Sequence, residues 1–343
     1  MLLQMLENKN IATIEEDQRC EGADFVLTQK AVSDIEEVVC QVTTYDVKPQ
    51  WHTSRINQRF PPIDDNHGHK YRGNGVDIYN LDSGIRYSHQ VFDGHRARFG
   101  GYDHYGNGRG DDDHGHGTHC AGLASGSITG PADRSNVYSI KVLNSNLGGS
   151  FSAIIAGINH VVQQAARSGR RTIISMSLIG PKSPTVDQVI KTAKERGVIS
   201  VVAAGNFRRD ACDYSPASSE DAITVGGTQE DGDKLYWFSS SSRSPGTDYG
   251  KCVDIFAPGQ WIRSAGHFCD DCLVSMSGTS MATPIAAGVV ALLLEQYPND
   301  SPDRIKNKLI DQSTKNALDF GVIGNDPNTP NRLVFVEPAS GKS

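Results

Sequence analysis

The segment Gly278-Thr279-Ser280-Met281-Ala282-Thr283-Pro284 introduces a long apolar run, and it decides the fold. The run predicts a buried helix over residues 279–296. Serine and threonine are favoured at the start of a helix, so Ser280 either belongs to the N-terminal cap or is a nucleophile. In the second case, the oxyanion that forms during the reaction faces the N–H groups at the helix terminus.

Outward from this helix, short β-branched runs alternate with longer amphipathic runs. The expected strands are 76–81, 137–142, 172–177, 198–203, 222–226 and 253–256. The other expected helices are 117–124, 152–168, 185–195 and 302–313. This alternation favours an α/β fold with a mostly parallel central sheet and helices on both faces.

The composition is ordinary for a globular protein and excludes several classes of function. Of the 343 residues, 37% are hydrophobic and 21% are charged, and the net charge of -7 argues against a nucleic-acid partner. The longest apolar stretch, near residues 289–294, is far shorter than the roughly 18 residues of a membrane span. Because the 7 cysteines are an odd number, at least one has no partner within the chain.

Two further segments carry groups that can do chemistry. In Leu81-Asp82-Ser83-Gly84 an aspartate ends a predicted strand, where it binds a metal, orients a histidine or caps a turn. The second segment holds His114, His116 and His119 among glycines. It is either a zinc site or one catalytic histidine at the start of a helix. Neither segment decides between its alternatives alone.

Taken together, these segments resemble the subtilase family. They match its Asp-Ser-Gly, His-Gly-Thr-His and Gly-Thr-Ser-Met-Ala-Thr-Pro signatures in the same order, and the resemblance runs from about Trp51 to Pro338. It implies a subtilisin-like three-layer fold and a serine endopeptidase that forms an acyl-enzyme, with Asp82, His116 and Ser280 as the catalytic triad. The metal interpretation loses support, because a metal site explains neither the aspartate nor the serine segment.

The resemblance also implies the parts of a substrate site. Asn206 corresponds to the asparagine of the family's oxyanion hole, where its side chain acts beside the Ser280 N–H. Two sheet edges that take the substrate as an added strand, and the strand before the asparagine, supply the expected substrate-binding residues. These are Gly148, Gly149, Ser177, Leu178, Ile179, Ala203, Ala204 and Gly205. The family usually has glycine at position 179, so Ile179 is expected to narrow the primary pocket or its neighbour.

The cysteine pattern resembles the proteinase K branch of the family. Cys120 corresponds to a free cysteine of that branch, and we expect a buried, inert thiol. Three stretches around other cysteines are similar to proprotein convertase subtilisin/kexin type 9, whose C-terminal domain has no counterpart in this sequence. That likeness implies disulfides Cys212–Cys252 and Cys269–Cys272, which leaves Cys20–Cys40 as a third candidate pair. Such bridges imply an oxidising compartment.

The first 50 residues are expected to lie outside the catalytic domain. Residues 11–17 resemble the last strand of the family's inhibitory propeptide. The expected division is a propeptide remnant (1–18), a connector (19–50), the catalytic domain (51–338) and a tail (339–343). Self-cleavage is expected between Cys40 and Gln50. The N-terminus lacks the features of a signal peptide, which we attribute to a chain that begins inside its precursor.

Catalysis is expected to need no cofactor, whereas structural calcium is common in the family. Asp254 corresponds to a carboxylate ligand in the proteinase K branch, with carbonyl oxygens near Glu220 and Ala222 as further donors. A salt bridge or a turn is the alternative role for Asp254. The acidic cluster Asp111–Asp113 is expected to be a solvated loop.

Two functions are consistent with the sequence. The first is a secreted, monomeric endopeptidase that acts on polypeptides, has its own propeptide as an inhibitor, and has neither a nucleic-acid partner nor a membrane span. The second is a self-cleaving, receptor-binding protein of the convertase kind, which retains its propeptide and has little activity in trans.

Overall fold

The structure is a computed structural model, and it describes residues 17–22, 50–63, 68–229, 234–235, 246–320 and 326–339. Its central layer is a sheet with the strand order β14-β15-β11-β10-β8-β6-β2-β4-β3. In chain order the strands are β2 (Val76–Asp82), β3 (Ala97–Asp103), β4 (Asn136–Lys141), β6 (Arg171–Met176), β8 (Ile199–Ala203), β10 (Ile223–Thr228), β11 (Ile255–Pro258), β14 (Thr314–Lys315) and β15 (Arg332–Leu333). All neighbouring pairs are parallel except β14 and β15.

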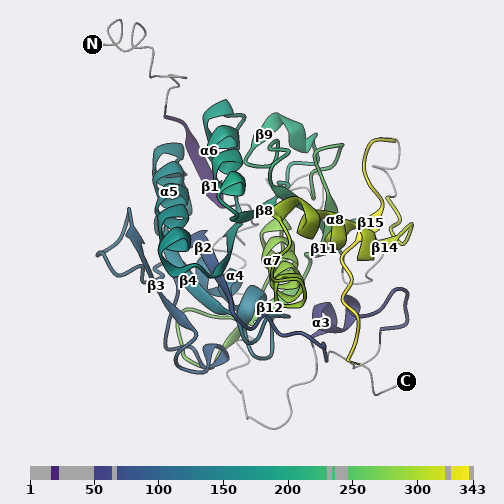
Figure 1. The fold of residues 1–343 in the computed structure, drawn as a ribbon, viewed down its shortest axis with the longest axis horizontal. Helices are drawn as coiled ribbons and strands as arrows, with labels where there is room; N and C mark the ends of the chain where they lie inside the picture. The colour runs from purple at the N-terminus through teal and green to yellow at the C-terminus, as the bar shows by residue number, and fades with distance from the viewer. Residues whose placement is uncertain are drawn as a thin grey trace, which may run out of the picture.

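Helices cover both faces of this sheet, as Figure 1 shows. One apolar core lies between the sheet and the pair α4 (His116–Ser125) and α7 (Thr279–Gln296). The second core lies between the opposite face and the pair α5 (Phe151–Ser168) and α6 (Pro184–Glu195). Because both faces are covered, the inner strands are buried along most of their length, and β2 is buried at every residue although it includes Asp77, Asn80 and Asp82.

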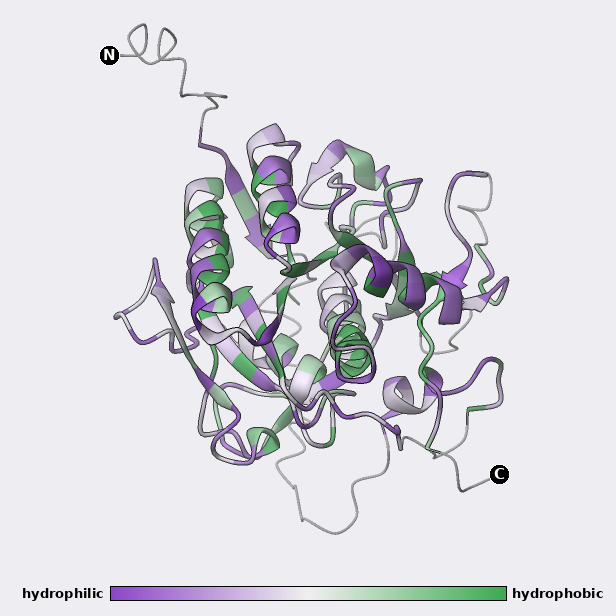
Figure 2. Ribbon diagram, viewed as in Figure 1, coloured by the Kyte–Doolittle hydropathy of each residue, from purple (hydrophilic) through white to green (hydrophobic). Residues whose placement is uncertain are grey.

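The helix boundaries follow from local sequence. Ser150, Ser183 and Ser301 lie directly before α5, α6 and α8 (Pro302–Gln312), and each side chain accepts an N–H of the first turn. Figure 2 shows α5 and α6 banded in purple and green, as expected for helices with one solvated face. By length and composition α7 could cross a membrane, but 89% of it is buried, so it is the central core helix.

Smaller elements lie around the central sheet. An antiparallel sheet has the order β5-β1-β7-β9, and a hairpin pairs β12 with β13. Their bounds are β1 (Arg19–Gly22), β5 (Gly148–Ser150), β7 (Leu178–Pro181), β9 (Tyr214–Ser215), β12 (Ile262–Ala265) and β13 (Leu273–Met276). The remaining elements are α3 (Trp51–Arg55), η1 (Gln90–Phe92) and η2 (Ala211–Asp213).

The fold class expected from the sequence is confirmed. Each of the predicted strands and helices is present, with ends that differ by a few residues at most. The pattern missed β3, the short strands β14 and β15 at the edge of the central sheet, the short helix α3 and the short strands of the smaller sheets. Of the expected domains, residues 1–16, most of the connector and residues 340–343 lie outside the described part of the chain.

Candidate active site

Asp82 and His116 form the buried centre of the site. Asp82 is the last residue of β2, and His116 is the first residue of α4. Asp82 Oδ1 lies 2.7 Å from His116 Nδ1, and both side chains are completely buried. The Ser83 N–H also donates to Asp82 Oδ1, at 2.7 Å. A carboxylate on Nδ1 keeps a proton on that nitrogen, so the lone pair of the imidazole is on Nε2.

A glycine and a serine let the two segments approach closely. A Cβ atom on Gly117 would meet the carbonyl oxygen of Gly84, so no larger residue fits at this turn of α4. Ser83 Oγ accepts the Gly117 N–H at 2.9 Å and donates to Asp112 Oδ1 at 2.8 Å. The start of α4 is therefore fastened to the end of β2.

Asp112 anchors the N-terminus of α4, a role that the sequence did not reveal. Its two carboxylate oxygens accept the backbone N–H groups of His114, Gly115 and Thr118 at 2.8–3.0 Å. Burial acts to raise the pKa of Asp112, but these hydrogen bonds and that of the Thr118 hydroxyl outweigh it and lower the pKa. The expectation of a solvated acidic loop was therefore wrong for Asp112, because α4 needs an acceptor at its N-terminus.

The neighbouring aspartates differ from Asp112. Asp113 pairs with Lys141, whose Nζ lies 2.6 Å from Asp113 Oδ1 and whose side chain is completely buried. Asp111 is exposed and pairs with the exposed Arg109. Asp111 and Asp113 are both exposed, so these two residues fit the expected solvated loop.

Ser280, in the first turn of α7, lies beside this pair. Its Oγ donates to the Ser177 carbonyl oxygen at 3.4 Å, and Ser177 Oγ donates to the Ser280 carbonyl oxygen at 2.8 Å. Cys120 Sγ lies 3.4 Å from that same carbonyl oxygen and 3.8 Å from His116 Nε2. One thiol therefore contacts both the histidine and the serine residue. The structure brings Asp82, His116 and Ser280 together at the carboxyl end of the central strands.

Asn206 follows β8 and is oriented by the serine segment. Its Oδ1 accepts the Thr279 N–H at 2.9 Å. Since only an oxygen accepts this bond, the side-chain nitrogen, which carries the N–H donors, is on the other side of the amide. The Gly205 N–H donates to Thr279 Oγ1 at 3.2 Å, which ties the two segments together. The side chain thus supplies an N–H beside the N-terminus of α7, where a developing negative charge is stabilised.

β1 lies between β5 and β7 and pairs with both, and we call this position between the two edges the groove. Arg19, Cys20 and Glu21 pair antiparallel with Ser150–Gly148, and Glu21 and Gly22 pair antiparallel with Ile179 and Leu178. The two predicted substrate edges therefore hold an extended segment of this same chain between them.

A comparison with protein families shows which family this chain belongs to. The model described as "Subtilase family" matches residues 73–330, a range that contains Asp82, His116, Asn206 and Ser280. The chain belongs to the subtilase family.

Known relatives agree with this membership. An extracellular serine proteinase of Thermus sp. (strain Rt41A) is 40% identical over 269 residues, which are 78% of this subtilase and 62% of that protein. Cerevisin of Saccharomyces cerevisiae is 33% identical over 342 residues, which cover 92% of this chain and 51% of that protein. The chain thus spans between one half and two thirds of the length of these curated relatives.

A solved structure extends the comparison to the fold. The crystal structure of a cold adapted subtilisin-like serine proteinase superposes with a TM-score of 0.75 at 34% identity. The alignment covers 84% of this chain and 99% of that one.

Ile179, at a position where the resemblance implied glycine, lies next to the Asn206 segment. Ile179 is 1% exposed and packs with Ala203, Phe207 and Tyr214. Its Cδ1 also lies against Gly205, so that a Cβ atom there would meet it at 2.5 Å. The branched side chain therefore fills the space between β7 and the segment that carries Asn206.

The other two histidines of the motif do not join a metal site. His119 is completely buried, its Nε2 lies 3.0 Å from the Ile262 carbonyl oxygen, and burial lowers its pKa to about 3. His114 is half-buried, and burial and the neighbouring His116 lower its pKa. Within the described residues, the group of metal-ligand atoms that lie close together is Asp82, His116 and Cys120. In this group the Asp82 and His116 side chains already hydrogen-bond to each other.

The cysteines of this subtilase follow most of the expected pattern. The disulfides Cys212–Cys252 and Cys269–Cys272 are both present. Cys120 is a free thiol, and burial raises its pKa, so the thiol stays protonated. The bridge Cys20–Cys40 is not formed. Cys20 is a free thiol buried in the apolar cluster beneath β5, where burial raises its pKa to about 12, and Cys40 lies outside the described residues.

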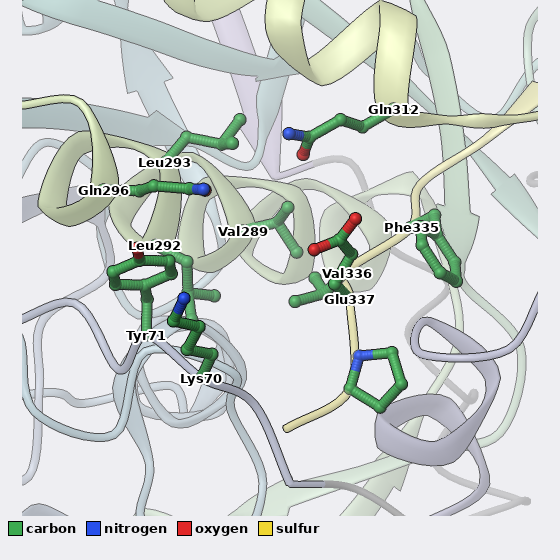
Figure 3. A pocket seen from close by; sticks show the side chains of 11 residues that line it. Lys70, Tyr71, Val289, Leu292, Leu293, Gln296, Gln312, Phe335, Val336 and Glu337 are labelled. Atoms are coloured by element: carbon green, nitrogen blue, oxygen red, sulfur yellow. The ribbon is translucent and has the colours of Figure 1, made fainter. Parts of the chain in front are cut away.

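Two other regions of the molecule are separate from this site. The expected calcium ligands Asp254, Glu220 and Ala222 do lie together, but they surround the ammonium group of Lys306. A hollow of about 150 Å³ lies between the C-terminal half of α7 and segments near residues 70 and 336. Figure 3 shows the side chains that line it. Because Ser280 is at the opposite end of α7, this hollow is not part of the active site.

Proposed function

We propose that this subtilase is a serine endopeptidase that hydrolyses peptide bonds through an acyl-enzyme. The observation that carries the proposal is the completely buried hydrogen bond of 2.7 Å between Asp82 and His116, next to a serine in the first turn of a helix. A histidine whose Nδ1 is held by a carboxylate is poised to accept a proton at Nε2. A serine hydroxyl that loses its proton to this nitrogen becomes a nucleophile.

The reaction follows in two balanced halves. Ser280 Oγ adds to the substrate carbonyl carbon while His116 Nε2 takes the hydroxyl proton. His116 returns that proton to the amide nitrogen as the C–N bond breaks, which releases the amine product. Water then adds to the acyl-enzyme by the same transfer, and the carboxylic acid leaves. The Asn206 side-chain N–H and the Ser280 backbone N–H donate to the oxyanion of each tetrahedral intermediate.

Labelling tests the proposed nucleophile. A sulfonyl fluoride should modify the intact protein once, at Ser280, with the loss of all peptidase activity. The Asp82→Asn variant keeps the same serine and is the matched control. Its labelling and its turnover should both fall by about 10⁴-fold, because the imidazole then has the wrong tautomer. Labelling of Ser280 at an unchanged rate in this variant would refute the proposed roles.

We further propose that β1 occupies the groove as a substrate would. It adds a strand to both edges through backbone hydrogen bonds, which a polypeptide of almost any sequence can form. Asp17, two residues before β1, accepts the N–H and the hydroxyl of Ser152 at 2.9 Å and 2.7 Å, which holds the segment at the start of α5. An N-terminal segment bound in this way blocks the entry of other polypeptides, as an inhibitory propeptide does.

The register of β1 suggests where the chain cuts itself. The antiparallel pairing advances one residue at a time, from Glu21 opposite Ile179 to Gly22 opposite Leu178. Beyond Leu178 this edge continues to Ser177, whose carbonyl oxygen accepts the Ser280 hydroxyl. We infer cleavage after Ala23, whereas the sequence favoured a position between Cys40 and Gln50.

A small residue before the cut also suits the wall of the site. Ile179 fills space that a glycine would leave open between β7 and the Asn206 segment. We infer that the primary pocket prefers small side chains such as alanine.

Mapping the new N-terminus tests the processing site. Mass spectrometry of the self-processed protein should find a chain that begins at Asp24, and the Ser280→Ala variant should remain uncut. A new terminus between residues 41 and 51 would refute the inference from the register while leaving the endopeptidase itself untouched.

Retention of the cut N-terminal segment would favour the second function, a self-cleaving binding protein. If the cut N-terminal piece stays bound in the groove, the protein cleaves only itself and then acts by binding, as the likeness to the type 9 convertase suggests. Gel filtration of the processed protein, followed by an assay on casein, distinguishes the two. Co-elution of the two pieces without Ser280-dependent turnover of casein would favour the binding protein, and release with turnover favours the protease. The two disulfides support a secreted location in either case.

A further inference from the structure

Three oxygen atoms of this chain point at one lysine, at a distance from the active site. The Lys306 ammonium lies 2.8 Å from Asp254 Oδ2, 2.6 Å from the Ala222 carbonyl oxygen and 3.3 Å from the Glu220 carbonyl oxygen. Lys306 is on α8, Asp254 directly precedes β11, and residues 220–222 lead into β10. The lysine therefore ties a helix to the ends of two neighbouring strands.

The oxygen atoms are held in position by the strands themselves. The Thr224 N–H donates to Asp254 Oδ2 at 2.9 Å, and the Asp254 N–H donates to the Thr224 carbonyl oxygen at 2.9 Å. Ala222 is completely buried. The carboxylate and the nearer carbonyl group thus lie directly before two paired strands, and backbone hydrogen bonds between Thr224 and Asp254 hold the carboxylate in place.

The charges around this point are balanced without a metal ion. A second lysine on the same face, Lys194, lies 2.8 Å from Asp221 Oδ1 and 2.6 Å from Asp303 Oδ1. Asp254 is the carboxylate that faces Lys306. Each lysine of this face is therefore paired with at least one aspartate.

A carboxylate and two backbone carbonyl groups are hard oxygen donors of the kind that bind calcium. In this chain the ammonium group already lies among them, so a divalent cation would meet a positive charge within hydrogen-bond distance of its own ligands. The residues present therefore do not fit calcium at this point. We propose that Lys306 acts as a built-in cation in place of a structural calcium ion, and that removing its ammonium group turns the same oxygens into a calcium site.

The proposal is independent of the proteolytic function, and its test measures stability. All variants carry Ser280→Ala, so that no self-digestion occurs. Thermal melting is measured in excess EDTA and in about 10 mM CaCl₂, roughly ten times the dissociation constant of a weak extracellular calcium site. Lys306→Ala should melt at a lower temperature than the parent in EDTA, and calcium should raise its melting temperature by about 2–4 °C relative to the parent's own response.

Two control variants identify the site. Lys308→Ala removes a lysine from the same helix, one that lies 3.6 Å from Asp300 Oδ2, and it should respond to calcium as the parent does. Adding Asp254→Asn to Lys306→Ala should abolish the gained response, because the carboxylate is then gone. An equal response of Lys306→Ala and Lys308→Ala would overturn the proposal.

The parent protein gives a second, separate test in case Lys306→Ala does not fold. The change in melting temperature that calcium causes should be the same in the parent and in its Asp254→Asn variant. A parent response that disappears with Asp254→Asn would mean that calcium already binds there beside the lysine, and it would also overturn the proposal.

Discussion

Asp248 should make the stability of the Asn206 loop depend on pH. Its side chain is completely buried, and Oδ1 accepts the N–H groups of Phe207 and Arg209 at 2.8 Å and 2.9 Å. Oδ2 has no hydrogen-bond partner among the described residues and faces Gly205. Burial raises the pKa of Asp248 to about 7, although the backbone N–H groups act to lower it. The carboxyl group therefore lies against the segment that carries Asn206, in an environment that disfavours its charge.

The sign and the size of the effect follow from the pKa shift. A carboxyl group whose pKa rises on folding stabilises the folded state while it is protonated. That contribution is complete below the unfolded pKa of 3.8 and is lost as the pH rises through the folded pKa of about 7. Each pKa unit corresponds to about 1.4 kcal/mol, so about 4 kcal/mol of unfolding free energy is lost above neutral pH. Asp248→Asn cannot ionise, and its amide oxygen can still accept the two N–H groups.

Urea unfolding at about pH 4 and about pH 9, with Ser280→Ala in every protein, measures this loss. The unfolding free energy of Asp248→Asn minus that of the parent should rise by about 4 kcal/mol between the two pH values. The exposed Asp311→Asn on α8 is the matched control and should follow the parent. Parallel pH dependence of the Asp248→Asn variant and the parent would refute the account of this carboxyl group.

Three further predictions concern Asn206, Ile179 and the disulfide Cys212–Cys252. Asn206→Leu should lower kcat by about 10²–10³-fold, the loss known for this donor in subtilisin, with little change in KM; an unchanged kcat in a peptide assay would remove Asn206 from the oxyanion hole. Ile179→Gly should raise kcat/KM for peptides with phenylalanine before the cut by about 10-fold or more relative to alanine, because it empties the wall of the pocket; a preference for alanine that stays the same would contradict the role of Ile179. Cys252→Ser should lower the unfolding free energy by about 2–4 kcal/mol, since Cys212–Cys252 closes a loop with a sequence separation of 40; an equal denaturation midpoint in urea would count against it.

The sequence predicted the central layers well because they follow simple periodic rules. The β-branched run of β2 and the capped amphipathic pattern of α5 each contain their own boundaries. Short strands such as β1 and β5 have no such pattern, since their pairing depends on segments more than 100 residues apart in the chain. The strand β1, which lies in the groove, was therefore not expected within the connector of residues 19–50.

The site was predicted where family motifs name the residue, and it was missed where only three-dimensional contacts do. Asp82, His116 and Ser280 lie in recognisable segments, and the structure brings them together. Asp112 and Asp248 look like ordinary loop aspartates in the sequence, although one caps α4 and the other is buried against the segment that carries Asn206. The pairing of Lys306 with a distant carbonyl group has no local sequence signal at all.

The most direct test of the central claim is the turnover of casein by the self-processed protein and by the same processed protein after sulfonyl fluoride has blocked Ser280. The amount of peptide released, measured at fixed times under identical conditions, gives the two rates. Blocking Ser280 should lower turnover by about 10⁴-fold or more, since the nucleophile is then lost. Equal turnover with Ser280 free and with Ser280 blocked would contradict the role of Ser280 as the nucleophile.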